Sequence, residues 1–308
     1  MKTFADRLQA SIEKTSSVLV AGCDPVLDAM PKFMIADAQS RYDNDEAIVA
    51  HVLNTFCETF LAAVAGRVAA IKPNIAFFEQ YGMAGLAVFE KFCREVREKD
   101  IPLITDAKRG DIGSTAAAYS AAYLGHSTLG GKPFRAFETD ALTVNPYLGF
   151  DTLEPFVKDC VAHGKGIFVL VQTSNPGAKA LQGLRAEGHT VSNHVARWLG
   201  SNAEQLRGAC GWSGLGAVVG ASYPQEARDL RNIMPDNFFL IPGLGAQGAG
   251  ADDAVAGFGA RNGTKGGALV NASRGLLAGE STSLEGLMGV IRGNTERFNE
   301  QLRAALAA

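Results

Sequence analysis

The chain has 308 residues, of which 47% are apolar and 20% are charged, and its formal net charge is −3. High hydrophobicity with low net charge excludes an intrinsically disordered chain, and the lack of a basic excess argues against a general nucleic-acid binder. A small cationic pocket for an anionic metabolite is still compatible with this charge, because net charge does not say where individual charges lie. The length fits one or two domains, and α/β barrels reach this size as one unit.

The cysteines and the N-terminus indicate a reduced, intracellular protein. The five cysteines are Cys23, Cys57, Cys93, Cys160 and Cys210. They are scattered, odd in number and include no C-x-x-C pair, which is typical of a protein without disulfides. Residues 1–14 are amphipathic, so we expect no signal peptide. No run of about 18 apolar residues occurs, so we expect a cytoplasmic protein that contacts no membrane.

Short apolar runs rich in β-branched residues alternate with longer segments of helical periodicity. The predicted strands are 17–23, 68–73, 102–107, 141–145, 166–172, 217–221, 238–242 and 268–272. Most of these runs are apolar at consecutive positions, as expected for parallel strands that are buried on both faces.

Helical patterns follow the strands, the first capped by Asn44 or Asp45 and the third by Ser114. The predicted helices are 45–65, 83–99, 114–124, 153–163, 193–208, 224–233, 251–258 and 283–307. Eight strand–helix units without a break in composition predict a single-domain (β/α)8 barrel over residues 1–308, with a doubly wound open sheet as the alternative. Connections 24–44, 125–140 and 175–192 are unusually long, and such loops are often functional.

Charged and polar side chains occur at the carboxyl ends of several predicted strands, which is where a barrel carries its chemistry. They are Asp24, Lys72, Asn74, Asp106, Lys108, Asp111, Asn145, Ser174 and Arg274. Because these strand ends meet at one rim of a barrel, the sequence predicts that the groups surround one site. Asn74 and Asn145 are equally compatible with a substrate contact and with support of the loops.

The stretch ITDAKRGDIGST, residues 104–115, is the most informative segment. Asp106 and Lys108 lie two apart on a predicted strand, so we expect their side chains on one face and that of Arg109 on the other. Opposite charges buried at a barrel mouth are costly unless they pair. They are therefore either an ion pair that only stabilises the barrel or part of a reactive site.

Lys72 on the preceding strand and Asp111, three residues after Lys108, favour the reactive site. Two lysines and two aspartates at one rim form a charge-balanced array. Each lysine would be kept protonated by neighbouring carboxylates, and each aspartate would be kept ionised by neighbouring lysines. Such an array favours a reactive site over an ion pair that only stabilises the barrel.

The ordered set of motifs resembles orotidine 5′-phosphate decarboxylase of the longer bacterial type, over essentially the whole chain. The family signature D-x-K-x-x-D-I-x-x-T is matched by Asp106, Lys108, Asp111, Ile112 and Thr115. The lysine of the second strand is matched by Lys72 in AIKPN.

The resemblance implies a cofactor-free and metal-free lyase that converts orotidine 5′-monophosphate to UMP and carbon dioxide in pyrimidine biosynthesis. Lys108 would stabilise the carbanion at C6 and then protonate it. Asp106 would lie near the leaving carboxylate, and Lys72 with Asp111 would complete the array and hold Lys108.

The resemblance also assigns substrate binding. Asp24 in AGCDP would hold the ribose, and Ser174 in VQTSNPGA would contact the pyrimidine. The phosphate would be gripped by Gly245, Gln247 and Arg274. Members of this family are homodimers with shared active sites, so Asp111 and Thr115 would reach into the site of the partner.

Three other functions compete with this interpretation. The segment 243–248 fits the dinucleotide pattern G-x-G-x-x-G, but it opens the second-to-last unit and no acidic residue ends the next strand. Magnesium-dependent sugar-phosphate decarboxylases or aldolases of the same barrel group share D-x-K-x-x-D, but they need a carboxylate where Lys72 stands. A non-catalytic binder of phosphate metabolites would keep costly buried charges without benefit. The five histidines lack the spacing of zinc ligands.

Overall fold

Eight parallel strands form the central sheet. They are β1 (Leu19–Cys23), β2 (Ala70–Pro73), β3 (Ile104–Arg109), β6 (Ala141–Val144), β7 (Gly166–Gln172), β10 (Ser213–Val219), β11 (Asn237–Pro242) and β14 (Ala268–Ala272). The computed structural model describes residues 2–244, 250–261 and 263–308. The strand order is β2-β1-β14-β11-β10-β7-β6-β3, and bridges between Ile71 and Leu103 and between Asn74 and Asp106 close the sheet. The predicted (β/α)8 barrel is confirmed, and the doubly wound open sheet is wrong.

The predicted strands are all present, but β3 lies two residues later than predicted at both ends, and β10 is displaced furthest. It begins at Ser213 rather than at residue 217 and ends at Val219 rather than at residue 221. Glycines at 214 and 216 hid its first half, because glycine has low β-propensity. Gly216 is required by packing, since an added Cβ would lie 2.5 Å from the ring of Phe168.

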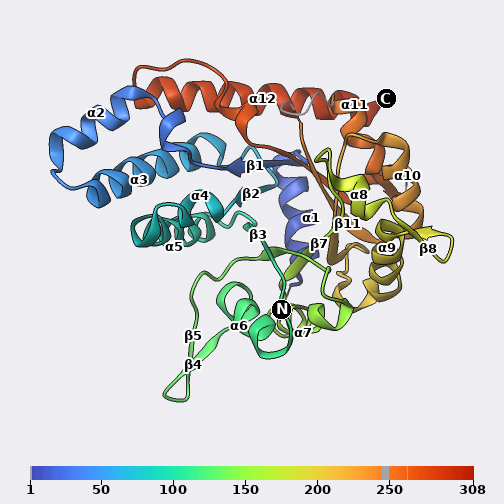
Figure 1. Ribbon diagram of the computed structural model, residues 1–308. Coiled ribbons are helices and arrows are strands. Elements are labelled where there is room, and N and C mark those ends of the chain that lie inside the picture. The colour runs from blue at the N-terminus through green and yellow to red at the C-terminus, as the bar shows by residue number, and fades with distance from the viewer. Residues whose placement is uncertain (1, 245–249, 262) are drawn as a thin grey trace.

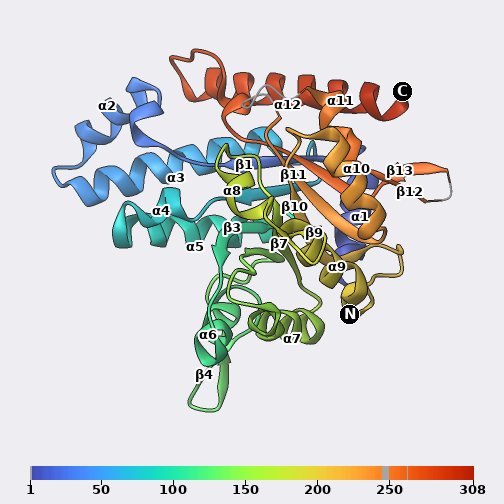
Figure 2. The ribbon, with the colours of Figure 1, turned by 45° about the vertical axis from the view of Figure 1, so that its right-hand side comes forward.

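Helices cover the outside of the barrel (Figures 1 and 2). Those that follow strands are α3 (Asp45–Val64), α5 (Gly82–Glu98), α6 (Gly113–Tyr123), α7 (Glu154–His163), α9 (Val191–Asn202), α10 (Pro224–Ile233), α11 (Ala251–Ala254) and α12 (Leu284–Ala307). The side chain of Asn44 caps α3, as predicted. The cap predicted at Ser114 is wrong, because α6 already begins at Gly113 and its first turn has no side-chain cap.

The long connections contain secondary structure that the sequence patterns did not reveal. Residues 24–44 hold α2 (Lys32–Arg41), and residues 175–192 hold α8 (Ala178–Gln182) and the hairpin β8 (Arg185–Ala186)–β9 (His189–Thr190). Residues 125–140 hold the hairpin β4 (Ser127–Leu129)–β5 (Lys132–Phe134), which projects from the body of the protein (Figure 1). These short elements bury too few side chains to produce a periodic apolar pattern. Further along the chain, β12 (Gly259–Arg261) pairs with β13 (Thr264–Gly266).

The hydrophobic core has two layers. The larger layer lies between the strands and the outer helices, and the smaller one fills the barrel. An N-terminal helix that was not predicted, α1 (Phe4–Thr15), closes the barrel at the amino ends of the strands. Its Phe4 is fully buried and meets the ring of Phe168 edge-on, with 6.0 Å between the ring centroids. Edge-to-face aromatic packing of this kind contributes about 1 kcal/mol beyond the area that it buries.

One described helix, α3, is long and apolar enough by composition to cross a membrane. Half of its apolar window is buried inside the protein, where α3 packs against α5 and α12. Such burial is typical of a core helix, whose apolar face is needed by the fold itself.

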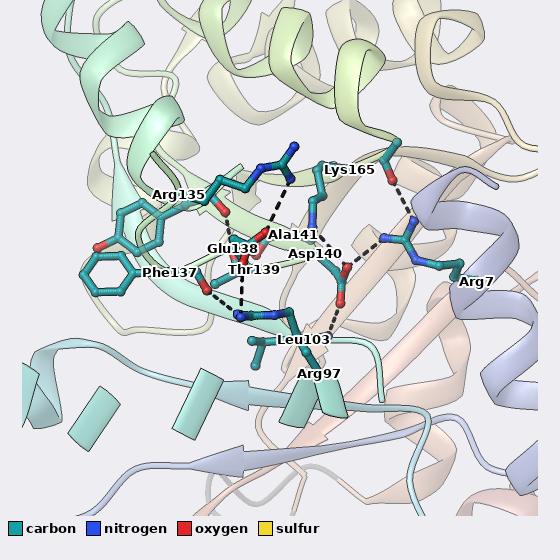
Figure 3. A network of polar contacts seen from close by, with 12 residues as sticks. Arg7, Arg97, Leu103, Arg135, Phe137, Glu138, Thr139, Asp140, Ala141 and Lys165 are labelled. Carbon is teal, nitrogen blue, oxygen red and sulfur yellow. Dashed lines mark hydrogen bonds and ion pairs between the residues drawn. The ribbon is translucent and has the colours of Figure 1, made fainter. Parts of the chain in front are cut away.

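A polar network around Asp140 fastens α1 to the barrel (Figure 3). The guanidinium of Arg7 lies 2.7 Å from Asp140 Oδ1, and the Lys165 ammonium lies 3.4 Å from the same oxygen. The backbone N–H of Leu103 donates to Asp140 Oδ2 at 3.0 Å. One carboxylate therefore joins α1 to the amino ends of three neighbouring strands, β3, β6 and β7.

Asp140→Ala is expected to lower the free energy of unfolding by about 3 kcal/mol, because it leaves two partly buried cations without their carboxylate. The decarboxylase activity that the resemblance implies should stay unchanged, since the network lies at the end of the barrel opposite the carboxyl ends of the strands. Denaturant unfolding measures the loss, with Glu296→Ala as control. Glu296 pairs with Arg67 at the surface, so its loss should cost under about 1 kcal/mol. Equal losses for the two variants would contradict a special role for Asp140.

Candidate active site

The carboxyl ends of the barrel strands surround a cavity of about 500 Å³. Six of the residues predicted for the site line it together, namely Asp24, Lys72, Asp106, Lys108, Ser174 and Arg274. They come from different strands or the turns that follow them, so the barrel brings together side chains that are up to 250 positions apart (24 to 274). The prediction of one shared site is confirmed for these six residues, whereas Asn74, Asp111 and Asn145 do not line the cavity.

Asp106 holds two lysines, one on each carboxylate oxygen. Lys72 Nζ lies 3.0 Å from Asp106 Oδ2, and Lys108 Nζ lies 2.6 Å from Asp106 Oδ1. The side chains of Lys72 and Asp106 are 7% and 12% exposed, whereas that of Lys108 is 49% exposed. Lys72 and Asp106 therefore form a buried base for the array, and Lys108 has its ammonium open to the cavity.

The protonation of this buried pair follows from its charges. Burial alone would raise the pKa of Asp106, but the positive charges of Lys72 and Lys108 outweigh it and hold that pKa well below its usual range. Burial alone would lower the pKa of Lys72, but the carboxylates of Asp106 and Asp24 outweigh it and raise that pKa. At neutral pH, Asp106 is ionised and Lys72 is protonated.

The backbone around Lys108 departs from a regular strand. Thr105 pairs with Leu142 and Arg109 with Val144, so residues 106–108 of β3 face one residue of β6. Lys108 has a φ of 48°, in the left-handed region, which costs about 1–2 kcal/mol for a residue other than glycine. Asp106 and Lys108 meet as expected, but a bulge brings them together rather than simple strand alternation.

Asp24 contributes a polar atom that the described chain leaves without a partner. Its Oδ1 is buried and accepts no hydrogen bond from residues 2–244, 250–261 or 263–308. The same holds for Oδ1 of Asn271, which also lines the cavity. Buried acceptors are costly unless a donor meets them, so both atoms are suited to a ligand that carries hydroxyl or N–H groups.

The predicted phosphate-binding side of the cavity is described in part. Arg274 is exposed at the cavity rim and makes no ion pair within the described residues. Gly243 has a φ of 108°, a conformation that favours glycine. Gly22 allows the turn before Arg274 to approach β1, because an added Cβ would overlap Ser273 Oγ. Gly245 and Gln247 lie outside the described residues.

Asp111 and Thr115 do not line this cavity. Asp111 Oδ1 accepts from the N–H of Ile112 at 2.8 Å, and Asp111 forms no ion pair with either lysine of the array. Thr115 is exposed in the first turn of α6. The single chain therefore brings together three of the four predicted catalytic residues.

The side chains beside the array have structural partners. Arg109 points away from the cavity, as expected, and pairs with Glu79 at 2.6 Å. The side-chain oxygens of Asn74 and Asn145 accept from the N–H groups of Ala76 and Tyr147, at 3.1 Å in both cases. Neither asparagine lines the cavity, which favours loop support over substrate contact.

Sequence reasoning missed several polar residues of the cavity, among them Thr143, Thr173, Gln182 and Asn271. Thr143 donates to Asp106 Oδ1 at 2.9 Å. Gln182, from the long connection 175–192, accepts from the N–H of Thr173 at 2.9 Å and donates to its hydroxyl at 2.8 Å. Single threonines and glutamines carry no distinctive spacing, so only the consecutive apolar residues around Thr143 hinted at its burial.

The described residues contain no group of three or more His, Cys, Asp or Glu side chains placed to hold a metal ion. The cavity offers two carboxylates, Asp24 and Asp106, and the ammonium of Lys72 interacts electrostatically with both. An ammonium in this position repels a cation, so the donor set does not suit the hard, oxygen-rich coordination of Mg²⁺.

Comparisons with known proteins identify the family of this chain. The model of the Orotidine 5'-phosphate decarboxylase / HUMPS family matches residues 48–286. The chain is 42% identical to the orotidine 5'-phosphate decarboxylase of Rhodopirellula baltica, over 98% of this chain and 100% of that protein. It is 41% identical to that of Caldicellulosiruptor bescii, over 82% and 83% of the two chains.

Solved structures give the same result. The OMP decarboxylase of Leishmania donovani superimposes with a TM-score of 0.74 at 29% identity, and the match covers 99% of both chains. The family match, the identity over the full length and the shared barrel all indicate the same family. The chain belongs to the Orotidine 5'-phosphate decarboxylase / HUMPS family.

Proposed function

We infer that this chain decarboxylates orotidine 5′-monophosphate to UMP and carbon dioxide in pyrimidine biosynthesis. The observation that carries this function is the ionised Asp106 held between Lys72 and Lys108 at the cavity floor of a member of this family. Loss of carbon dioxide leaves an electron pair on C6 of the pyrimidine, where no adjacent carbonyl delocalises it. An organic cofactor usually supplies an electron sink for such a step, and here fixed positive charge takes that place.

Lys108 is the proposed electrophile and proton donor. When the bond between C6 and the carboxylate breaks, its electron pair stays on C6, and the nearby ammonium stabilises that charge. A proton then passes from Lys108 Nζ to C6, and the neutral amine recovers a proton from solvent. Half of the Lys108 side chain is open to the cavity, which supports contact with a substrate.

Asp106 and Lys72 keep Lys108 in place. Asp106 Oδ1 accepts from Lys108 Nζ at 2.6 Å, and the opposite oxygen is bound by Lys72. Asp106 would also lie near the leaving carboxylate. Asp24 and Asp106 together balance the two lysines, and Arg274 at the rim adds the positive charge that suits an anionic nucleotide.

The remaining cavity residues would bind the nucleotide. The unpartnered oxygen of Asp24 suits a ribose hydroxyl, and Ser174, which lines the cavity, would contact the pyrimidine. Arg274, with Gly245 and Gln247, would grip the phosphate. A guanidinium binds phosphate through two parallel hydrogen bonds, so Arg274 would fix the orientation of the nucleotide as well as its affinity.

The deciding experiment is an ultraviolet assay of orotidine 5′-monophosphate in the presence of EDTA. We expect the absorbance to fall as UMP forms, at a rate that the chelator does not change. Activity that EDTA abolishes and Mg²⁺ restores would favour the magnesium-dependent sugar-phosphate enzymes instead. Tight UMP binding without any turnover would favour a non-catalytic binder.

We propose that the active protein is a homodimer with shared sites. The rim beside the cavity exposes apolar side chains on two adjacent loops, with Ile112 62%, Tyr147 73% and Leu148 52% exposed. The loops are in contact, since the N–H of Asn145 donates to the carbonyl of Arg109. An apolar rim beside an incomplete charge array supports an interface through which Asp111 and Thr115 reach the partner's cavity.

Mixing two inactive variants tests this arrangement. Asp111→Ala and Lys108→Ala should each be inactive alone, but their mixture, after subunit exchange, should recover about one quarter of wild-type activity. Random mixing makes half of the dimers mixed, and one of the two sites in each mixed dimer then carries no substitution. A mixture that stays inactive although the subunits exchange, or a fully active monomer, would contradict shared sites.

A cytoplasmic location, without contact to membrane or nucleic acid, belongs to the same proposal. All five cysteines are free thiols, and four of them are buried. Buried free thiols are typical of proteins from a reducing compartment.

A further inference from the structure

Thr143 uses the full hydrogen-bonding capacity of its hydroxyl. The side chain belongs to β6, and the residue is only 2% exposed. Its Oγ1 accepts from the N–H groups of Ala107 and Lys108, at 3.0 and 2.9 Å, and donates to Asp106 Oδ1 at 2.9 Å. A hydroxyl has one donor and two acceptor sites, so all three are occupied.

This arrangement fixes the direction of the hydrogen bond to Asp106. Both lone pairs of the hydroxyl face backbone N–H groups, so its only proton points at the carboxylate. The bond requires that Asp106 Oδ1 carries no proton. Thr143 is thus the uncharged member of a set of three donors around Asp106, beside Lys72 and Lys108.

The same hydroxyl replaces backbone hydrogen-bond acceptors that are missing at the bulge in β3. Residues 106–108 face Thr143 alone, so two backbone N–H groups lack the carbonyl partners that a regular strand would supply. The Thr143 hydroxyl accepts from both. One of them is the N–H of Lys108, whose φ of 48° persists only if its surroundings hold it.

We propose that Thr143 is a positioning residue for the reaction, acting through both Asp106 and the backbone of Lys108. This inference rests on the proposed decarboxylase function. The Thr143 hydroxyl holds both the Asp106 carboxylate and the backbone of Lys108, which has a left-handed conformation. In this way Thr143 determines the position of the Lys108 ammonium in the cavity. Its contribution belongs to the chemical step and not to the binding of the nucleotide.

Thr143→Val removes the hydroxyl and keeps the shape of the side chain. We expect kcat for orotidine 5′-monophosphate to fall by about 10- to 100-fold, the usual effect of losing a group that orients a functional residue. KM and the affinity for UMP should stay near the wild-type values, because the ribose and phosphate contacts are untouched. Thr143→Ser keeps the hydroxyl and should retain most of the wild-type kcat.

Thr139→Val is the matched control. Thr139 is fully buried two residues before the same strand begins, and its hydroxyl lies 3.3 Å from the carbonyls of Tyr123 and Ala141. It should lose stability without loss of kcat, which separates a general folding defect from a defect in positioning. Thr143→Ala serves as a second variant if Thr143→Val does not fold.

The outcomes separate this inference from the function on which it rests. A wild-type chain that does not turn over orotidine 5′-monophosphate would overturn both. An active wild type together with an unchanged kcat in Thr143→Val, or equal kcat values in the Ala and Ser variants, would overturn the positioning role alone. A rise in KM with unchanged kcat would do the same, because it would assign Thr143 to binding.

Discussion

Lys108→Ala is expected to reduce kcat for orotidine 5′-monophosphate by about 10⁴-fold or more, because acid catalysis and electrostatic stabilisation are lost together. Lys72 cannot take over, since its side chain is buried and bound to Asp106. The affinity for UMP should change far less, because the proposed contacts to ribose and phosphate come from other strands. Initial rates by ultraviolet absorbance and UMP titration measure the two effects.

The control for this prediction is Lys91→Ala. Lys91 lies on α5 and pairs at the surface with Glu58 and Glu95, at 2.6 and 3.5 Å. Removing it changes the net charge by the same amount but leaves the cavity intact, so turnover should be unaffected. Near-normal turnover in a well-folded Lys108→Ala variant would show that another group protonates C6, and the proposed mechanism would fail.

Asp106→Asn is expected to abolish turnover and also to lower the free energy of unfolding by about 3 kcal/mol or more. The substitution keeps the shape of the side chain but leaves the buried ammonium of Lys72 with Asp24 as its remaining carboxylate partner. It also brings the positive charges of Lys72 and Lys108 together without a compensating charge between them. Denaturant unfolding of wild type and variant measures the difference.

The pH dependence of this difference provides a sharper test. Because the folded pKa of Asp106 is depressed, its contribution is complete above the unfolded value of about 3.9 and is lost as the pH falls through the folded pKa. Because the folded pKa of Lys72 is raised, its contribution is complete below the unfolded value of about 10.4 and is lost at higher pH. The difference in the free energy of unfolding between wild type and Asp106→Asn should therefore be constant between about pH 5 and 9 and should become smaller at lower and at higher pH. A difference that became larger in acid would contradict the ionised state of Asp106.

Much of the barrel was predictable because its strands are buried on both faces. Such strands appear as continuous apolar runs, and each run is bounded by polar or glycine residues. The displaced start of β10 shows the limit of this signal, since Gly214 and Gly216 look like a turn until the ring of Phe168 is placed against them. Helix α1 was not predicted, although residues 1–14 are amphipathic. Its position at the amino ends of the strands depends on contacts with residues far along the chain, which a local pattern does not show.

The candidate site was predictable to the extent that it depends on strand ends. Asp24, Ser174 and Arg274 follow strands, Lys72 and Asp106 lie within theirs, and a barrel places the carboxyl ends of its strands around one cavity. The assignment of Asp111 and Thr115 to a partner's site stays a prediction. So does the role of Gly245 and Gln247 in binding the phosphate.

Residue type and spacing alone established the alternation of strands and helices, the charged rim and the resemblance to a decarboxylase, because these depend on local order along the chain. Pairing between distant strands decided the rest. The bulge in β3, the left-handed Lys108 and the three bonds of the Thr143 hydroxyl exist only because β6 lies beside β3 in one register. Hydrogen bonds of this kind depend on tenths of an ångström between segments that are far apart in sequence, and no local pattern carries that information.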